Sequence, residues 1–412
     1  MAIQGLRSTS DFVTDQRPKN WREGYLYLEP NGDAPLAGLT SQMKSRTVDD
    51  PEFHWWDKTR NTQRYELHAT NGDLTTTNTT LTLAATEEAR TLKDGDLLYV
   101  EQNGEILQVN GDPTSATSVV VTRGFAGTTP AALDANGVGI NPKLSKIGSA
   151  YEEGSLAPTS VRYDPTKRTN YTQIFRDTLA FTRTAMKTKL RTPDDVKEAK
   201  KECLEYHMAG IERAFWFGVA SESTRNGEPM RSTDGILNVI PASNKVNANT
   251  DYAAGLTMAG LEDYLRQAFT YGSNEKMGFL GNNALLVINQ ICRRNSQFQI
   301  QSGIKEYGMD VSRLISPFGT LVLKTHKMFN QLTGGTTTGA AYYGMAHKLI
   351  ILDMANLQYV SLNGSDTEYE SDLTPKGLDG MKSGYITEAA IQVGLGSTHF
   401  AISGLNRAAV DS

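Results

Sequence analysis

The sequence has 412 residues and carries 41 Lys and Arg against 46 Asp and Glu, for a formal net charge of −5. This near-balance argues against a freely diffusing nucleic-acid binder with a basic surface, and the 17 Tyr, 13 Phe and 4 Trp argue against a disordered chain. With Gly counted and Tyr left out, roughly 44% of the residues are apolar, just under the ~45–50% of globular chains. We therefore expect two or three subdomains that are either extended or completed by the hydrophobic surface of other chains.

Cysteine usage and hydropathy bear on where the protein is made. Cys203 and Cys292 are the only two cysteines, which is typical of buried thiols in a reducing compartment rather than of a disulfide framework. Residues 1–16 lack the basic start and the apolar run of a signal peptide. No stretch approaches the ~18–20 apolar residues of a membrane span, so we expect a soluble protein made in a cytoplasm.

Residues 1–61 show no helical or strand pattern long enough to close a core, so we expect an arm rather than a domain. The arm ends in the aromatic run Phe53-His54-Trp55-Trp56. One interpretation is that these rings plug the chain's own core. The other is that Trp55 and Trp56 anchor the arm on a neighbouring subunit, because Trp and Tyr are favoured at buried interface centres.

From residue 62 to residue 146 the sequence changes to short alternating strands. Asn103-Gly104 separates two of them and predicts a two-residue type I′ hairpin, because both turn residues must adopt positive φ. The threonine-rich run from Thr75 to Thr82 suits an exposed strand better than a helix. We interpret the block as a small all-β subdomain inserted into the main fold.

Residues 149–191 form a second β-rich segment. A turn at Asp164-Pro165 precedes an alternating run that includes Tyr171, Phe175 and Phe181. The simplest interpretation of the segment is a long β-hairpin.

The strongest single element begins at Thr192-Pro193-Asp194-Asp195. Thr192 is a predicted N-cap, Pro193 suits the first helical position, and the two acids complement the helix dipole. Gly218 marks the end of a predicted helix over 193–217, which is long for a globular protein and is expected to act as a spine. Apolar residues recur along it at steps of three and four, at Val196, Ala199, Cys203, Leu204, Met208, Ile211, Ala214 and Phe215.

Beyond residue 250 the pattern is mixed α/β. We expect an amphipathic helix over 258–271, a buried strand over 284–288 and a polar helix over 291–301. Further strands are expected over 319–325, 341–344, 349–353, 357–362, 386–393 and 400–402.

A search for catalytic or metal-binding residues finds no convincing set. Cys203 and His207 share one face of the predicted helix at i, i+4, but no third ligand is evident, so a structural role is favoured. Residues 334–339 lack the Gly-Lys-Ser/Thr ending of a phosphate-binding loop, and residues 394–397 lack a nucleophile motif. We predict no enzymatic activity, no cofactor and no metal.

Two segments carry opposite net charge. Residues 161–201 hold 11 Lys and Arg against 5 acids, a net +6, and residues 351–380 hold 6 acids against one Lys, a net −5. In a repeating assembly such segments can set the register between neighbours. The alternatives are a solvated acidic loop and a basic segment that contacts DNA phosphates. The candidates for subunit contact are Trp55, Trp56, Arg176, Arg183, Lys187, Lys189, Arg191, Asp366, Glu368, Glu370 and Asp372.

The order of these parts resembles the major capsid proteins of tailed bacteriophages with the Hong Kong 97-like fold, and more narrowly a podovirus-associated group. The sequence features that carry the resemblance are Trp55-Trp56-Asp57, the Arg-Gly-Phe-Ala-Gly-Thr-Thr run at 123–129 and the Glu-Arg-Ala-Phe-Trp-Phe-Gly run at 212–218. None is a catalytic signature. The resemblance therefore rests on the order of the β-rich, helical and mixed α/β segments from about residue 49 onward.

The resemblance implies an α+β chain with a Hong Kong 97-like capsid fold and the inserted all-β subdomain. For that subdomain our hypothesis is an outward-facing insertion that braces neighbouring subunits. The expected division is an N-terminal arm (1–61), the inserted subdomain (62–148), an extended β-hairpin loop over a neighbouring subunit (149–191), a peripheral domain with the spine helix (192–249), an axial domain (250–345) and return strands of the peripheral domain (346–412).

The resemblance also implies a function, namely self-assembly into the hexamers and pentamers of an icosahedral virus shell around double-stranded DNA. The expected partners are further copies of the chain, portal, scaffold and decoration proteins, and non-specifically bound DNA, with assembly in the cytoplasm of a bacterial host. Neither a cleavage site nor a Lys–Asn crosslink is carried over. The alternatives are an encapsulin-like bacterial nanocompartment shell and, from another class, an uncharacterised hydrolase.

Overall fold

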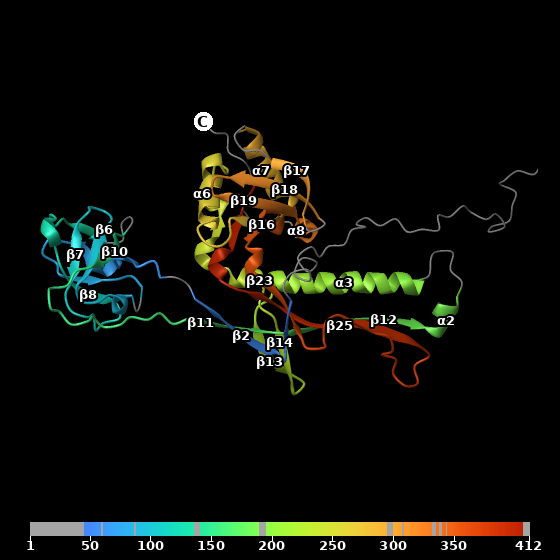
Figure 1. The fold of residues 1–412 in the computed structure, drawn as a ribbon. Helices are drawn as coiled ribbons and strands as arrows, with labels where there is room; N and C mark the ends of the chain where they lie inside the picture. The colour runs from blue at the N-terminus through green and yellow to red at the C-terminus, as the bar shows by residue number, and fades with distance from the viewer. Residues whose placement is uncertain are drawn as a thin grey trace, which may run out of the picture. The chain divides into compact units, whose positions relative to one another are not determined.

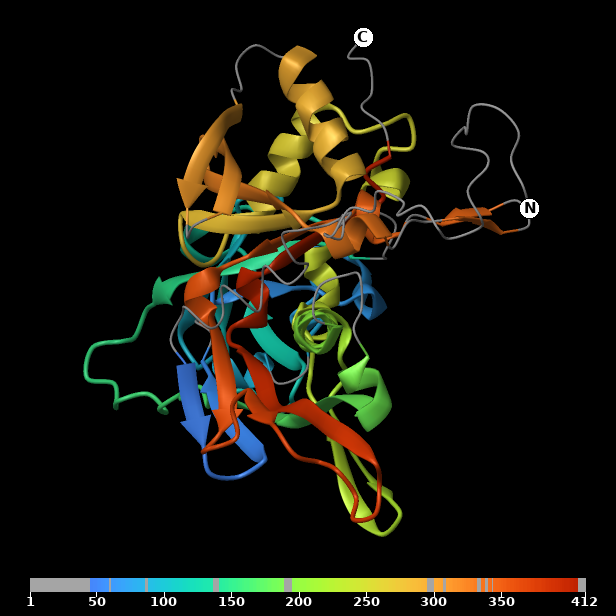
Figure 2. The same ribbon diagram turned by 90° about the vertical axis from the view of Figure 1, so that its right-hand side faces the viewer.

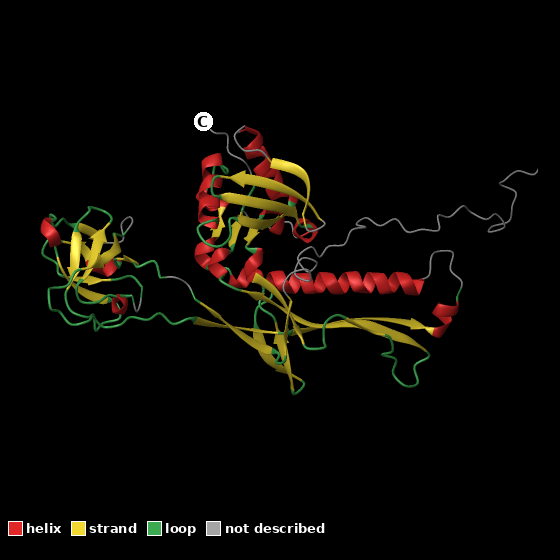
Figure 3. Cartoon of the chain, viewed as in Figure 1, coloured by secondary structure: helices red, strands yellow, loops and turns green. Residues whose placement is uncertain are grey.

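The computed structural model describes residues 45–58, 61–85, 88–135, 141–188, 195–294, 300–306, 309–331, 335–337, 340–342 and 344–406. The chain divides into two compact units: the first combines residues 1–57 with 167–412, and the second comprises 58–166. The first unit contains helices and several sheets, whereas the second contains strands joined by loops and short helical turns (Figure 3). The predicted α+β fold is therefore confirmed.

The first unit is built on a long ribbon of two antiparallel strands. β12 (Gln173–Thr182) pairs with β25 (Gly380–Val393) at ten consecutive positions. Side chains that alternate along β12 therefore point to two different faces of the ribbon. The sheet is completed by β23 (Leu357–Leu362), β1 (Ser45–Val48) and the short β24 (Glu368–Glu370).

The spine helix α3 (Asp195–Phe217) lies along this ribbon (Figure 1). One imidazole ties the helix to both strands, because His207 Nδ1 lies 2.8 Å from Asp177 Oδ2 on β12 and His207 Nε2 lies 2.8 Å from Thr387 Oγ1 on β25. The helix therefore covers one face of the ribbon.

The end of α3 was predicted correctly, and its start cannot be compared. The helix stops before Gly218, where a Cβ atom would lie 2.4 Å from the carbonyl oxygen of Thr233, so only glycine fits. The predicted N-cap and first helical residue, within 192–194, lie outside the described residues.

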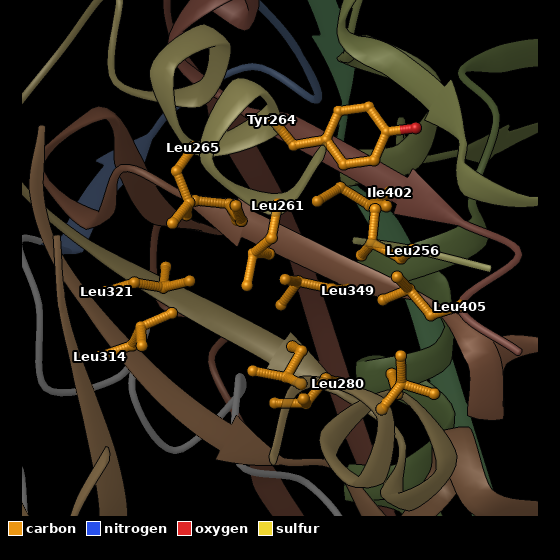
Figure 4. Packing of buried hydrophobic residues seen from close by; sticks show 14 of the residues in the cluster. Leu256, Leu261, Tyr264, Leu265, Leu280, Leu314, Leu321, Leu349, Ile402 and Leu405 are labelled. Carbon is orange, nitrogen blue, oxygen red and sulfur yellow. The ribbon is translucent and has the colours of Figure 1, made fainter. Parts of the chain in front are cut away.

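A seven-stranded mixed sheet forms the other half of the first unit. Two helices, α6 (Met258–Ala268) and α7 (Asn282–Arg294), pack against it (Figure 2). Leu261 and Leu265 of α6 point toward leucines of the sheet (Figure 4). In sheet order the strands are β15 (Lys245–Asn247), β26 (Phe400–Ser403), β22 (Leu349–Leu352), β16 (Glu275–Leu280), β19 (Gly319–Thr325), β18 (Met309–Ser316) and β17 (Ile300–Glu306).

A buried aromatic cluster joins α3 to this mixed sheet. The Trp216 ring meets Phe279 and Phe329 edge-on, at centroid distances of 5.3 and 5.1 Å. Its Nε1 donates to Glu212 Oε1 over 3.0 Å, and the same oxygen lies 2.8 Å from His326 Nε2. A polar network inside an apolar core thus fixes the helix against the sheet.

The strand predicted over 284–288 is wrong, because α7 runs through it and ends at Arg294. The predicted strand and residues 291–294 of the helix predicted over 291–301 belong to this one helix, whereas residues 300 and 301 lie in β17. A short apolar run does not by itself distinguish strand from helix. The buried positions reveal the helical stripe at steps of three and four: Ala284, Val287, Ile288, Ile291 and Cys292.

The second unit is a small closed β-barrel. Its six strands follow the order β3 (Arg64–Glu66), β10 (Lys143–Ser149), β6 (Asp96–Val100), β7 (Ile106–Val109), β8 (Ser118–Thr122) and β5 (Thr80–Thr82).

The barrel closes where the first and last strands meet. Leu67 and Leu83 form a bridge, His68 N donates to Thr82 O over 2.8 Å, and Ala84 N donates to Glu66 O over 2.7 Å. Alternate residues fill the interior, as a barrel of this size requires. The buried apolar side chains are those of Tyr65, Leu67, Leu74, Leu81, Leu83, Ala89, Leu92, Leu98, Val100, Leu107, Val109, Val119, Val121, Leu133 and Leu144.

The type I′ turn predicted at Asn103-Gly104 is wrong. β6 and β7 do form a hairpin, but Val100 N donates to Glu105 O, which leaves a four-residue loop in which only Gly104 has a positive φ. The two-residue turn occurs instead at Asn226-Gly227, where φ is 54° and 86° and Arg225 pairs with Glu228. Both sites carry the same dipeptide, so the dipeptide alone does not fix the turn type, which depends on the loop length that the strand pairing leaves.

The hairpin predicted over 149–191 is also wrong. The segment contains strands, but β11 (Thr166–Tyr171) pairs with β2 (Glu52–Asp57) and β12 pairs with β25. An alternating pattern predicts a strand without identifying its partner, and both partners here are remote in sequence. The chain therefore leaves β2 for the second unit and returns from it into the neighbouring strand β11.

The remaining elements are short. They are α2 (Arg183–Lys187), β13 (Ser221–Arg225), β14 (Glu228–Ser232), α4 (Ile236–Val239), α5 (Ala248–Asp251), α8 (Lys327–Gln331), β20 (Gly335–Thr337), β21 (Ala340–Tyr342), β4 (Gly72–Leu74) and β9 (Leu133–Ala135).

Candidate subunit interface

The two predicted aromatic anchors on β2 have opposite environments. Trp55 packs against a small buried cluster, and its ring stacks on Phe53 at a centroid distance of 5.9 Å. Trp56, the next residue along the strand, points to the other face, and 64% of its surface is exposed. The interpretation as an internal plug fits Trp55, whereas an anchoring role fits only Trp56.

The basic and acidic segments lie against each other within one chain. Arg176 on β12 forms an ion pair with Glu370 on β24, at 3.3 Å, and Arg183 pairs with Asp379 at 2.8 Å. This follows from the sheet order, because β24 and β12 both pair with β25. All four side chains remain at least a third exposed, so each pair contributes little to folding.

The other charged candidates are distributed as follows. Lys187 in α2 and Glu368 in β24 are exposed. Asp366 accepts a hydrogen bond from the Tyr359 hydroxyl at 2.8 Å, and Asp372 accepts one from Thr374 N at 3.1 Å, which lowers the pKa of Asp372. Lys189 and Arg191 lie outside the described residues.

The Cys203 and His207 pair has a structural role. Both ring nitrogens of His207 are occupied by Asp177 and Thr387, so neither is left for a metal. Burial raises the pKa of the Cys203 thiol, and the nearby Asp177 carboxylate adds to this, so the reactive thiolate is disfavoured. Among the described residues, no group of His, Cys, Asp and Glu is arranged to hold a metal ion.

A groove between β12 and the β13–β14 hairpin was not anticipated from the sequence. It has a volume of about 410 Å³, and its lining includes the apolar Ile174, Pro229 and Met230 and the basic Arg225 and Arg231. The available signal was Asn226-Gly227, which predicts a hairpin wherever strand-like residues flank it. The exposure of Met230 beside that turn is known only from the structure.

No helix in the described part of the chain is both long and apolar enough to cross a membrane. The helix long enough to be considered, α3, carries Lys, Glu and Arg along its length.

The sequence is similar to those of known phage capsid proteins. The sequence model of a family described as SU10 major capsid protein matches residues 14–406. A major capsid protein of Pseudomonas phage PaMx41 is 27% identical over 375 residues, which cover 89% of this chain and 84% of that protein.

Solved structures of shell proteins are similar at low sequence identity. The capsid of a native GTA particle shares 9% identity, covers 97% of this chain and 99% of its own, and has a TM-score of 0.47. The SrpI encapsulin of Synechococcus elongatus PCC 7942 shares 9% identity over 59% of this chain and 76% of its own, with a TM-score of 0.40.

Proposed function

Because the chain belongs to the SU10 major capsid protein family, we propose that its copies assemble as hexamers and pentamers into an icosahedral shell that encloses double-stranded DNA. The family match from residue 14 to residue 406 is the observation that carries this proposal. Membership confirms the prediction of a phage major capsid protein, a component of the virion capsid.

Exposed apolar side chains on the first unit support self-association. Trp56, Val219 and Ile174 are 64%, 60% and 59% exposed, and all three lie on or beside thin strands rather than over a core. A neighbouring copy that covered these side chains would remove their apolar surface from water. Neighbouring copies would supply the hydrophobic surface that the composition lacks.

The proposal extends to the division of the chain and to its partners. We assign 1–61 to an arm, 192–249 and 346–412 to a peripheral domain, and 250–345 to an axial domain. The extended loop is reassigned from 149–191 to the β2–β11 ribbon, since that ribbon carries the inserted unit. The proposed partners are portal, scaffold and decoration proteins, and DNA that the basic segment contacts non-specifically. Assembly is proposed to take place in a bacterial cytoplasm.

The test is assembly of the purified chain. Expressed with its phage's scaffold or alone, it is expected to sediment as large particles that electron microscopy resolves as closed shells with five-fold and six-fold clusters. A chain that stays monomeric under all assembly conditions would refute the proposal. A nanocompartment shell is not favoured, because the family match and the curated relative are both phage capsid proteins.

Charge reversal in the basic segment separates assembly from folding. Changing Arg183, Lys187 and Lys189 to Glu is expected to reduce shell yield severalfold while changing the free energy of unfolding by less than about 1 kcal/mol, because exposed ion pairs contribute little. Urea unfolding and sedimentation measure the two effects. As a control, Arg183→Asp combined with Asp379→Arg restores the pair within the chain; full recovery of assembly by this swap would assign Arg183 an intramolecular role.

Removing the second unit tests the bracing hypothesis. Joining Asp57 to Lys167 through a two-residue Asn-Gly turn keeps β2 and β11 paired, so the first unit is expected to fold and shells to disassemble at lower urea concentrations. Light scattering against urea measures the loss. Shells as resistant as the wild type would show that the insertion does not brace its neighbours.

A further inference from the structure

The groove between β12 and the β13–β14 hairpin has the chemistry of a receptor for one aromatic side chain. Ile174 and Met230, which line it together with Pro229, are 59% and 49% exposed although both are apolar. A volume of about 410 Å³ is at the low end of ligand pockets, which suits one large side chain rather than a helix.

The β13–β14 hairpin, which forms one wall of the groove, is largely exposed to solvent. Every residue of β13 and the first three of β14 are exposed. An isolated two-stranded hairpin is marginally stable in water, so a contact along this wall would stabilise it. A partner bound in the groove would therefore stabilise the hairpin and also bury the exposed apolar side chains that line it.

From these observations we infer that the groove receives Trp56 of a second copy of the chain. Trp56 is the most exposed tryptophan among the described residues, at 64%, and it points away from the cluster that buries Trp55. Tryptophan dominates interface energetics when it is seated in a fitted pocket. The inference rests on the proposed shell, since it is the shell that brings copies together.

The groove offers each part of an indole a suitable contact. A methionine sulfur contacts aromatic rings favourably, which assigns Met230 to the ring face. Arg225 and Arg231 also line the groove, and their guanidinium groups can stack on the indole as cations. A buried indole N–H needs an acceptor, and the carboxylates of Glu228 and Glu388 line the same groove.

The chain's own Trp56 cannot occupy the groove. Thr172, which lines the groove, donates from its N–H to Pro51 O, and His54 Nδ1 lies 3.0 Å from Thr169 Oγ1 farther along the ribbon. Trp56 is five residues beyond Pro51, so its backbone lies about 16 Å along the strand from the point where Pro51 meets Thr172, and Trp56 does not line the groove. An indole side chain does not span that distance, which leaves a second copy as its source.

The decisive experiment is thiol crosslinking in assembled shells. In a Cys203→Ser background, Trp56→Cys and Met230→Cys are combined in one chain, assembled and treated with a short bismaleimide that takes the place of the indole. Because each chain would donate one cysteine and receive another, denaturing electrophoresis is expected to show a ladder of linked chains. A direct disulfide would need Cβ atoms within about 4.5 Å, closer than a seated indole allows, so the crosslinker is the probe that matches the proposed contact.

The matched control pairs Trp56→Cys with Leu286→Cys, which is 56% exposed on α7 and does not line the groove. No ladder is expected from this control. An equal ladder in the control, or shells of the Trp56 and Met230 pair that give no ladder, would overturn the inference.

A second measurement uses single substitutions. Trp56→Ala is expected to raise the chain concentration needed for half-maximal assembly by about tenfold or more, Trp56→Phe to raise it less, and Ile174→Asp to match Trp56→Ala. Unfolding of the unassembled chain should not change with Trp56→Ala, because the side chain is exposed. Normal assembly of Trp56→Ala would refute the inference alone, whereas failure of the wild type to form shells would refute the proposed function.

Discussion

Arg123→Ala is expected to lower the free energy of unfolding of the second unit by about 3–5 kcal/mol, because it leaves a carboxylate buried without its partner. The Arg123 and Glu105 side chains are 4% and 0% exposed. Their two nitrogen–oxygen contacts are both 2.7 Å, a bidentate geometry. The pair lowers the pKa of Glu105 in spite of burial, so the carboxylate stays ionised inside the barrel wall.

The same arginine also connects three segments of the unit. It donates to the Thr75 carbonyl at 2.9 Å and to the Ala131 carbonyl at 2.5 Å, while Glu105 accepts from Gly124 N at 3.1 Å. Three loops would lose their common attachment in Arg123→Ala. The Arg-Gly-Phe-Ala-Gly-Thr-Thr run thus has a structural role in holding the barrel together.

Hydrogen exchange of amides within 61–135 in the full chain measures this effect locally. Arg64→Ala is the matched control, since its bidentate pair with Glu101 is on the surface, with side chains 49% and 32% exposed. A loss in Arg123→Ala no larger than in Arg64→Ala would contradict the expectation. Replacing Arg123 and Glu105 together by Leu and Met should recover part of the loss.

Acid is expected to destabilise the first unit between about pH 6.5 and pH 4, by an amount on the order of 3 kcal/mol. Burial, with a smaller contribution from Lys276, lowers the pKa of His399 to about 4, although Asp353 and the Gly394 backbone act in the opposite direction. His399 is 0% exposed, and its Nδ1 accepts from Asp353 N over 3.2 Å. Protonation of Nδ1 would end that hydrogen bond.

The sign follows from the two pKa values. Below pH 6.5 a histidine in the unfolded chain binds a proton, whereas folded His399 does not bind one until about pH 4. Each decrease in pH within this window therefore favours the unfolded chain. Urea unfolding at pH 7, 5.5 and 4 measures the slope. His399→Gln keeps an acceptor for Asp353 N without titrating, and it should flatten the slope in this window. An unchanged slope in His399→Gln would assign the acid sensitivity to other groups.

Local patterns in the sequence predicted the elements better than their partners. The stripe of α3 and the alternation along β23 lie within a few turns or residues, so each can be recognised without the rest of the chain. The hairpin over 149–191 was wrong because β12 finds its partner about two hundred residues later, in β25. Pairing over such separations depends on tertiary packing that no window of sequence contains.

The same limit applies to the candidate interface. The sequence located charged segments of opposite sign, but their contact within one chain depends on β24 lying beside β25. Trp55 and Trp56 were grouped together because they are adjacent, although adjacent residues of a strand face opposite sides. The groove was missed because its walls come from β12 and from a hairpin some fifty residues later.

The attachment of the second unit has a consequence for how capsid proteins of this kind can change. β2 ends at Asp57 and β11 begins at Thr166, and paired strands lie about 5 Å apart, so the two ends of the insertion are held side by side. Any compact domain whose own termini are adjacent could be exchanged at this junction without altering the pairing beneath it. A lineage could therefore gain, lose or replace this module in one recombination event, and an engineer could use the same junction to display a foreign domain.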